Sequence, residues 1–416
     1  MKFEALKLID PILHAVRSQG YEVPTPIQAQ SIPLILDRKD VLACAQTGTG
    51  KTAAFALPIL QLLTEGKPPH PGRRDIRVLV LTPTRELASQ IAENFSEYGK
   101  KLPFRTAVVF GGVNQNSQIR TLNQGVDILI ATPGRLLDLM QQNQVQLRGL
   151  QILVLDEADR MLDMGFIHDV RRIISRIPHS RQTLFFSATM PPEIRKLSEQ
   201  ILKNPVRIEV TPVASTVEKI EQLVYHVESR QKVPLLIHLL KNPKILRALV
   251  FTRTKRDANR VSEALNHSGI RANAIHGNKS QAARERALES IKKGECRVLV
   301  ATDIAARGID IDHVTHVFNH DIPNISESYV HRIGRTARAG TEGSAFSFCA
   351  SNERTFLLNI ERLIRKKITV ITTPEKLENE VRSPKKNHRP SHEKRHQPKK
   401  NSKGSVKIRP HSRSSG

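Results

Sequence analysis

The chain has 416 residues, 39% of them hydrophobic, which is enough for two or three soluble domains with separate cores. Its 65 Lys and Arg outnumber 40 Asp and Glu, and the net charge of +25 favours a polyanionic partner. No apolar run reaches the roughly 18 residues of a membrane span, and the first ten residues lack a signal-peptide core. Three widely spaced cysteines exclude a disulfide framework. We therefore expect a cytoplasmic protein without a membrane partner.

Short β-branched segments alternate with helical patterns in two successive series, which predicts two α/β domains with doubly wound parallel sheets. The first series of expected strands covers residues 41–45, 78–82, 106–110, 128–131, 152–155 and 183–186. The second series covers residues 223–227, 248–252, 272–275, 298–301, 315–319 and 344–349. A polar segment at 211–218 separates them. We predict a first domain over residues 1–208, a linker over 209–218, a second domain over 219–371 and a tail over 372–416.

A phosphate-binding loop is predicted where the first strand ends. A tight glycine-containing turn leads into Lys51 and the start of a helix, so backbone amides, the helix N-terminus and the lysine can all face phosphate. The loop begins with Ala45, where the general pattern has glycine. The residues expected to bind the nucleotide here are Thr47, Gly48, Thr49, Gly50, Lys51 and Thr52.

Such a loop requires an acidic partner at the end of a neighbouring strand, and the apolar segment 152–155 leads directly into Asp156 and Glu157. We expect Thr52, Asp156 and Glu157 to bind Mg²⁺, with Asp156 acting through water, and Glu157 to position or deprotonate the attacking water. Taken alone, the four residues Asp156–Asp159 would more often be the acidic N-terminus of a helix. Their combination with Lys51 favours the catalytic interpretation.

These blocks resemble the DEAD-box RNA helicases, and the similarity extends from Phe3 to about Ile371. The resemblance implies two tandem RecA-like domains that use ATP and Mg²⁺. Ahead of the phosphate loop, residues 20–28 are similar to the family's adenine-reading motif. It implies that Gln28 contacts the adenine edge while Tyr21 and Phe3 stack or pack beside the base.

The resemblance also implies RNA contacts at strand ends in the first domain, from hydroxyls, glycine amides and arginines suited to gripping phosphates. The residues concerned are Pro83, Thr84, Arg85, Gly111, Gly112, Thr132, Pro133, Gly134 and Arg135. Ser187 and Thr189 resemble the element that couples hydrolysis to RNA. Elsewhere a Ser-Ala-Thr triplet would be an ordinary helix cap.

In the second domain, residues 250–253, which include Arg253, and residues 281–284 match RNA-facing loops of the family, and for either loop a structural role is nearly as plausible. Thr302 and Asp303 match further RNA-facing positions. The nucleotide-facing and coupling positions are Gly308, Asp310 and His331. Arg335 and Arg338 would act as arginine fingers on the γ-phosphate and would share one face if this segment is helical.

Because Lys51 and Arg335 lie in different domains, the resemblance implies that hydrolysis requires closure and that closure on RNA separates a few base pairs. Two alternatives remain: a non-catalytic RNA clamp or annealing protein, and a DNA translocase. Within the family, the order of blocks is most similar to the bacterial RhlE-like branch. Ribosome-assembly or RNA-decay proteins are possible further partners.

The end of the chain has a different composition. From Arg382 to Gly416 there are twelve Lys and Arg against one acid, with almost no large apolar side chains. Such a segment cannot bury enough apolar surface to offset its ordering entropy, so we predict disorder. A solubilising tail is one interpretation. RNA tethering is favoured, because clustered cations near a phosphate backbone release counterions.

Overall fold

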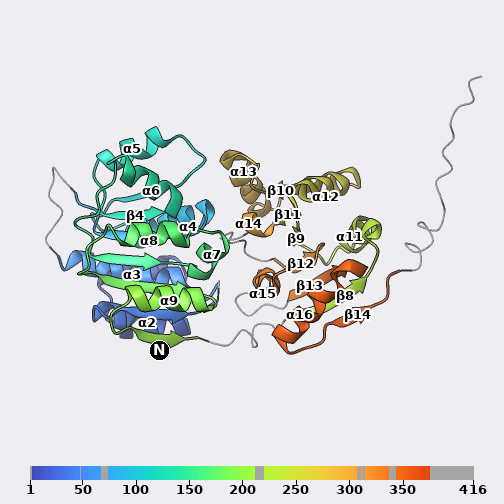
Figure 1. Ribbon diagram of the computed structural model, residues 1–416, viewed down its shortest axis with the longest axis horizontal. Helices are drawn as coiled ribbons and strands as arrows, with labels where there is room; N and C mark the ends of the chain where they lie inside the picture. Colours follow the sequence, from blue (N-terminus) through green and yellow to red (C-terminus); the bar gives the residue numbers. More distant parts are fainter. Residues whose placement is uncertain are drawn as a thin grey trace, which may run out of the picture.

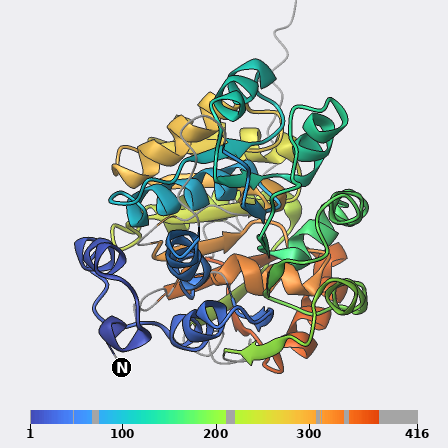
Figure 2. The same ribbon diagram turned by 90° about the vertical axis from the view of Figure 1, so that its left-hand side faces the viewer.

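Two parallel β-sheets form the core of the protein in the computed structural model, which describes residues 2–46, 48–66, 74–210, 220–306, 311, 314–336 and 343–374. Figure 1 shows them as two lobes side by side, the first coloured blue to green and the second yellow-green to red. In Figure 2, seen from the side of the first lobe, the lobes lie one behind the other. No helix within the described ranges is both long and apolar enough to cross a bilayer.

The first sheet has the strand order β3-β4-β2-β5-β6-β1-β7, with parallel pairing throughout. Its strands are β1 (Val41–Cys44), β2 (Val78–Leu81), β3 (Thr106–Val109), β4 (Ile128–Ala131), β5 (Ile152–Leu155), β6 (Gln182–Ser187) and β7 (Val206–Glu209). The helices of this domain are η1 (Phe3–Leu6), α1 (Asp10–Ser18), α2 (Pro26–Leu36), α3 (Lys51–Thr64), α4 (Arg85–Tyr98), α5 (Gln115–Asn123), α6 (Pro133–Gln141), α7 (Ala158–Asp163), α8 (Ile167–Ile174) and α9 (Pro192–Ile201).

The second sheet repeats this topology in the order β10-β11-β9-β12-β13-β8-β14. Its strands are β8 (Ile220–His226), β9 (Ala248–Thr252), β10 (Ala272–Ile275), β11 (Val298–Thr302), β12 (His316–Asn319), β13 (Gly343–Cys349) and β14 (Thr369–Ile371). Its helices are η2 (Ser229–Gln231), α11 (Lys232–Leu240), α12 (Lys255–His267), α13 (Gln281–Lys292), α14 (Asp303–Ala306), α15 (Ser326–Ile333), η4 (Ser351–Glu353) and α16 (Arg354–Ile364).

Successive side chains of a strand point to opposite sides, so each sheet has a hydrophobic cluster on both of its faces. In β2, Val78 and Val80 belong to one hydrophobic cluster and Leu79 and Leu81 to another. The strand β9 divides in the same way between two clusters of the second domain. Because the strands run parallel, the carboxyl ends of the central strands lie at one edge of each sheet, where ligands of such folds bind.

The predicted fold class of two tandem α/β domains is confirmed, and each of the twelve expected strands is found within three residues of its predicted bounds. Two strands, β7 and β14, were missed. Both are edge strands of three or four residues with exposed positions, so they lack the continuous apolar signal of a central strand. Residues 211–218 of the predicted linker and the tail from 375 onward lie outside the described residues.

Candidate active site

The phosphate loop joins β1 to α3 through two glycines in the left-handed region. Gly48 and Gly50 have φ values of 86° and 88°, and a Cβ on Gly50 would overlap the Nε2 atom of Gln28. Lys51 is the first residue of α3, and its buried ammonium donates to the Ala45 carbonyl at 3.0 Å. Thr49 Oγ1 donates to Gln46 O at 2.8 Å. The loop therefore aims a lysine and a helix N-terminus at one point.

The acidic pair follows β5, as predicted from sequence. Asp156 is buried, and its Oδ1 atom has no hydrogen-bond partner within the described part of the chain. Burial raises the pKa of Asp156 to about 6, and the nearby Lys51 opposes this rise. An orphaned buried carboxylate oxygen is costly unless a ligand satisfies it. It is the feature expected of a metal or phosphate site.

Glu157 is held by a buried arginine that sequence reasoning missed. Arg160 Nη1 donates to both carboxylate oxygens of Glu157, at 2.9 and 2.8 Å, and both side chains are almost fully buried. Burial raises the pKa of Glu157, but Arg160, Lys51 and Arg335 together bring it below its ordinary value. Glu157 is therefore ionised near neutral pH. The signal was present as an acid and an arginine three residues apart.

Ser187 and Thr189 contact Asp159, the last residue of the acidic segment Asp156–Asp159. The Asp159 backbone N–H donates to Ser187 Oγ at 3.1 Å, and Thr189 donates to Asp159 Oδ2 through both its backbone N–H and its hydroxyl, each at 2.9 Å. Ser187 in turn donates to the Thr189 carbonyl at 2.8 Å. These hydroxyls tie the end of β6 to the acidic motif after β5.

At the other end of the site, Gln28 lies against the phosphate loop. Its Oε1 accepts from the Thr25 backbone N–H at 2.9 Å, and its Nε2 donates to the Gly50 carbonyl at 3.2 Å. These two bonds leave one N–H and one lone pair of the amide for a ligand. Tyr21 lines the same cavity, with its hydroxyl 3.2 Å from that of Tyr98. Phe3 does not line it: this side chain is buried in the core and borders a neighbouring hollow.

A cavity of about 580 Å³ joins these parts and includes two residues from the second domain, Lys292 and Arg335. From the first domain it is lined by, among others, Lys51, Thr52, Asp156 and Glu157. The helix α15 ends at Ile333, so Arg335 lies in the turn that follows it. The prediction that Arg335 and Arg338 share one face required this segment to be helical, and at Arg335 it is not. Arg338, Thr47, Gly308 and Asp310 lie outside the described residues.

The candidate RNA residues of the first domain come together around Arg85. Thr84 caps α4 by accepting from the Leu87 backbone N–H at 3.3 Å, and Thr132 and Pro133 begin α6. A side chain at Gly112, where φ is 76°, would overlap the Arg85 guanidinium. Arg135 donates to the Val113 carbonyl at 3.3 Å. The segments predicted to contact RNA, which also include Pro83, Gly111 and Gly134, thus meet at the carboxyl edge of the sheet.

In the second domain, the candidate RNA residues are engaged by partners that the sequence did not indicate. Asp303 accepts two hydrogen bonds from Arg332, at 2.6 and 2.7 Å, and Thr302 precedes it at the end of β11. Arg253, which follows β9, donates to Glu353 Oε1 at 2.6 Å. His331 borders a hollow with Arg160 of the first domain. Burial, together with Arg160, lowers the pKa of His331 to about 4, so its imidazole is neutral near pH 7.

An ion pair joins the two domains at Arg284, in the segment for which the sequence left RNA contact and a structural role open. Arg284 lies in the first turn of α13, and its Nη2 atom is 2.9 Å from Glu86 Oε2 in α4. Both side chains are buried, with exposed fractions of 10% and 4%. A buried charge pair that spans two domains exists only while they are in contact. It therefore favours the closed arrangement.

Fold and site define a two-domain RecA-like nucleotide hydrolase whose candidate site is lined by residues of both domains. The sequence matches the DEAD/DEAH box helicase model over residues 25–197 and the helicase conserved C-terminal domain model over 231–340. It is 45% identical over 374 residues to the DEAD-box ATP-dependent RNA helicase CshA of Bacillus cereus, covering 89% of this chain and 70% of that protein. The chain belongs to the DEAD-box ATP-dependent RNA helicases.

Two solved structures of one relative superimpose on this chain to different degrees. Saccharomyces cerevisiae Dbp5 bound to RNA and ADP BeF3 is 31% identical and superimposes with a TM-score of 0.80, covering 91% of this chain and 97% of that one. A Dbp5 variant bound to Nup159, Gle1, IP6 and ADP is 30% identical, with coverage of 90% and 98%, and gives a TM-score of 0.60. The chain is therefore more similar in structure to the RNA-bound form than to that complex.

Proposed function

We propose that this ATP-dependent RNA helicase closes its two domains on ATP and RNA, separates short duplexes locally and reopens after hydrolysis. The observation that supports this most strongly is the shared cavity, where Arg335 of the second domain faces the same space as Lys51 and Glu157 of the first. A triphosphate in that space would contact both domains. ATP and RNA would each favour the closed state, and so each would favour binding of the other.

For the chemical step, we assign complementary roles to the charged residues of the cavity. Lys51 binds the β- and γ-phosphates, Glu157 orients the attacking water, and Arg335 and Arg338 stabilise charge that develops on the γ-phosphoryl group. Thr47, Gly48, Thr49 and Gly50 cradle phosphate, and Gly308 and Asp310 approach the nucleotide from the second domain. Ser187, Thr189 and His331 couple this site to the RNA side.

Magnesium fits the residues present. Asp156 offers an orphaned buried carboxylate oxygen and Thr52 a hydroxyl on the same cavity, and Glu157 lies beside them. Mg²⁺ is usually bound by one or two carboxylates, substrate phosphates and water, so a dense protein cage is not required. The ion would neutralise charge on the phosphates. In this proposal Thr52, Asp156 and Glu157 bind it, with Asp156 acting through water.

RNA is the proposed polynucleotide because the candidate contacts are threonine hydroxyls, backbone amides and arginines at strand ends, which suit phosphates and 2′-hydroxyls rather than base edges. The proposed domain bounds are 1–208, 209–218, 219–371 and 372–416, with the basic tail as an RNA tether in the cytoplasm. Ribosome-assembly or RNA-decay partners stay a prediction. So does the RhlE-like branch, since the compared relatives are named CshA, which is a different branch.

A steady-state ATPase assay tests this function. Turnover is measured without nucleic acid, with single-stranded RNA and with DNA of the same sequence, and duplex separation is followed in parallel. We expect stimulation by RNA alone and loss of turnover in Glu157→Gln. Glu193→Gln, which changes an exposed acid on α9, is the matched control. Absence of RNA stimulation would favour a passive clamp, and equal stimulation by DNA would favour a DNA translocase.

A further inference from the structure

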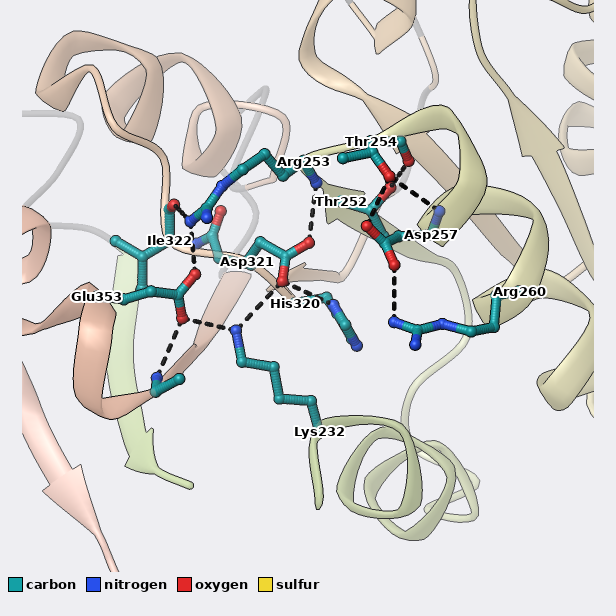
Figure 3. Close-up of polar contacts among 12 residues, drawn as sticks. Lys232, Thr252, Arg253, Thr254, Asp257, Arg260, His320, Asp321, Ile322 and Glu353 are labelled. Atoms are coloured by element: carbon teal, nitrogen blue, oxygen red, sulfur yellow. Dashed lines mark hydrogen bonds and ion pairs between the residues drawn. The ribbon is translucent and has the colours of Figure 1, made fainter. Parts of the chain in front are cut away.

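A cluster of charged side chains, most of them buried, lies at the carboxyl edge of the second sheet, outside the nucleotide cavity (Figure 3). Arg253 directly follows β9, Asp321 lies two residues after β12, and Glu353 lies shortly after β13. These three strands are neighbours in the sheet. Their ends therefore meet: the carboxylates of Asp321 and Glu353 contact Lys232, and the Arg253 side chain reaches Glu353.

Lys232 is the centre of the cluster. Its ammonium lies 2.6 Å from Glu353 Oε2 and 3.2 Å from Asp321 Oδ1, and only 3% of its side chain is exposed. Glu353 is equally buried and also accepts from the Ala350 backbone N–H at 3.0 Å. A buried lysine persists only when its charge is compensated. Here two carboxylates from different loops compensate it, so the lysine joins those loops.

The electrostatic balance of the cluster depends on this lysine. Burial raises the pKa of Asp321, but its hydrogen bond with His320 and the charge of Lys232 bring it well below its ordinary range. Two carboxylates, one lysine and one arginine together carry no net charge. Without Lys232 the two acids would repel each other in a buried place, and removing one member of such a set is more damaging than its net contribution suggests.

The carboxylates hold Arg253 at two points. Its backbone N–H donates to Asp321 Oδ2 at 2.9 Å, and its Nη2 atom donates to Glu353 Oε1 at 2.6 Å and to the Ile322 carbonyl at 3.0 Å. Among the residues that the structure describes, the side-chain hydrogen bonds of Arg253 all use Nη2, which leaves Nε and Nη1 available to a ligand. The Arg253 side chain is 45% exposed. Thr252 pairs in register with Thr302, so Arg253 lies beside the other candidate RNA residues of this domain.

We propose that Lys232 is a positioning residue for RNA binding, which acts through Asp321 and Glu353 to hold the Arg253 guanidinium toward the phosphate backbone. The inference rests on the proposed RNA function of the carboxyl edge. An arginine held in place loses less conformational freedom on binding than a mobile one. Lys232 itself does not touch the RNA.

The test compares RNA dependence with stability in Lys232→Met, Glu353→Gln and Arg253→Met. We expect each to raise the RNA concentration for half-maximal ATPase about tenfold, the loss of one charge-assisted contact. In Lys232→Met, turnover at saturating RNA should stay within about twofold of the parent. The Lys232→Met/Arg253→Met double variant should be no worse than Arg253→Met alone, because the lysine acts only through that arginine.

Asp127→Asn is the matched control. Asp127 is buried, lies just before β4 at the amino ends of the strands of the first sheet, and pairs with Arg74 and Arg77. Its loss should therefore lower the melting temperature without changing the RNA dependence. If Lys232→Met fails to fold, Glu353→Gln decides. An RNA response changed in Arg253→Met but not in Lys232→Met or Glu353→Gln would overturn the positioning role alone. A parent protein that does not respond to RNA would instead overturn the proposed function.

Discussion

The two domains share one topology, but the lysine at the start of the α-helix after the first strand has a different environment in each. In each, the helix that follows the first strand begins with a lysine, Lys51 in α3 and Lys232 in α11, and acidic residues follow the fifth strand. In the first domain the lysine opens onto a cavity of about 580 Å³ beside an orphaned Asp156 oxygen. In the second domain the chain supplies its own anions, Asp321 and Glu353, at the corresponding lysine.

The difference follows from the segment before each lysine. Left-handed glycines keep side chains out of the first loop, whereas a short 3-10 helix, η2, leads into Lys232. In the first domain the lysine lines the cavity, whereas in the second domain the lysine pairs with Asp321 and Glu353. In our proposal the second domain contributes to the reaction through Arg335, in the turn after α15.

The sharpest test of this division is removal of the arginine that the second domain contributes. Arg335→Ala should lower RNA-saturated ATP turnover by roughly 10³-fold or more, because an arginine finger stabilises the transition state more than the bound nucleotide. Steady-state ATPase at saturating RNA measures it. The exposed Arg354→Ala in the same domain should leave turnover unchanged. Equal turnover in both variants would mean that the second domain does not complete the site.

Substituting the two corresponding lysines breaks the comparison directly. Lys51→Met should lower ATP turnover by about 10²- to 10³-fold, since it removes a preorganised charge from the phosphates. Lys232→Met should instead affect the RNA dependence. Parallel titrations of ATP and RNA for both variants separate the two roles. A loss of RNA-saturated turnover in Lys232→Met comparable with that in Lys51→Met would contradict the assignment of different uses.

The ion pair between the domains should affect coupling rather than either site alone. Arg284→Glu places two acids against each other in the closed state, so the enhancement of RNA binding by an ATP analogue should fall about tenfold. Fluorescence anisotropy of labelled RNA, with and without the analogue, measures it. Exchanging both charges, as Glu86→Arg with Arg284→Glu, should restore part of the coupling. The exposed Arg286→Glu on α13 is the control.

The smallest effect is expected at the adenine end. Gln28→Ala removes the amide that contacts Gly50 and, in our proposal, the adenine edge, so the ATP concentration for half-maximal turnover should rise several-fold, roughly the loss of one or two hydrogen bonds. The exposed Gln30→Ala on the same helix should have no effect. If the parent protein uses GTP as well as ATP, Gln28 has no role in selecting adenine.

The sequence predicted what depends on local pattern. Alternating strands and helices, the glycine turn before Lys51 and the acids after β5 are contiguous signals, and the structure brings Lys51, Asp156 and Glu157 to one cavity. Partners distant in sequence were not predictable in this way. Arg332 holds Asp303 from 29 residues away, and Arg284 meets Glu86 in the other domain. Such pairs depend on how strands are ordered in the sheet and on how the domains meet, which no single segment encodes.

The most direct test of the central claim is a crystal structure of the protein with single-stranded RNA and a non-hydrolysable ATP analogue. The account predicts that the Arg335 guanidinium and the Lys51 ammonium contact the same terminal phosphate, with the Glu86–Arg284 pair intact. A bound triphosphate held by Lys51 alone, with Arg335 turned away while RNA occupies both domains, would contradict it.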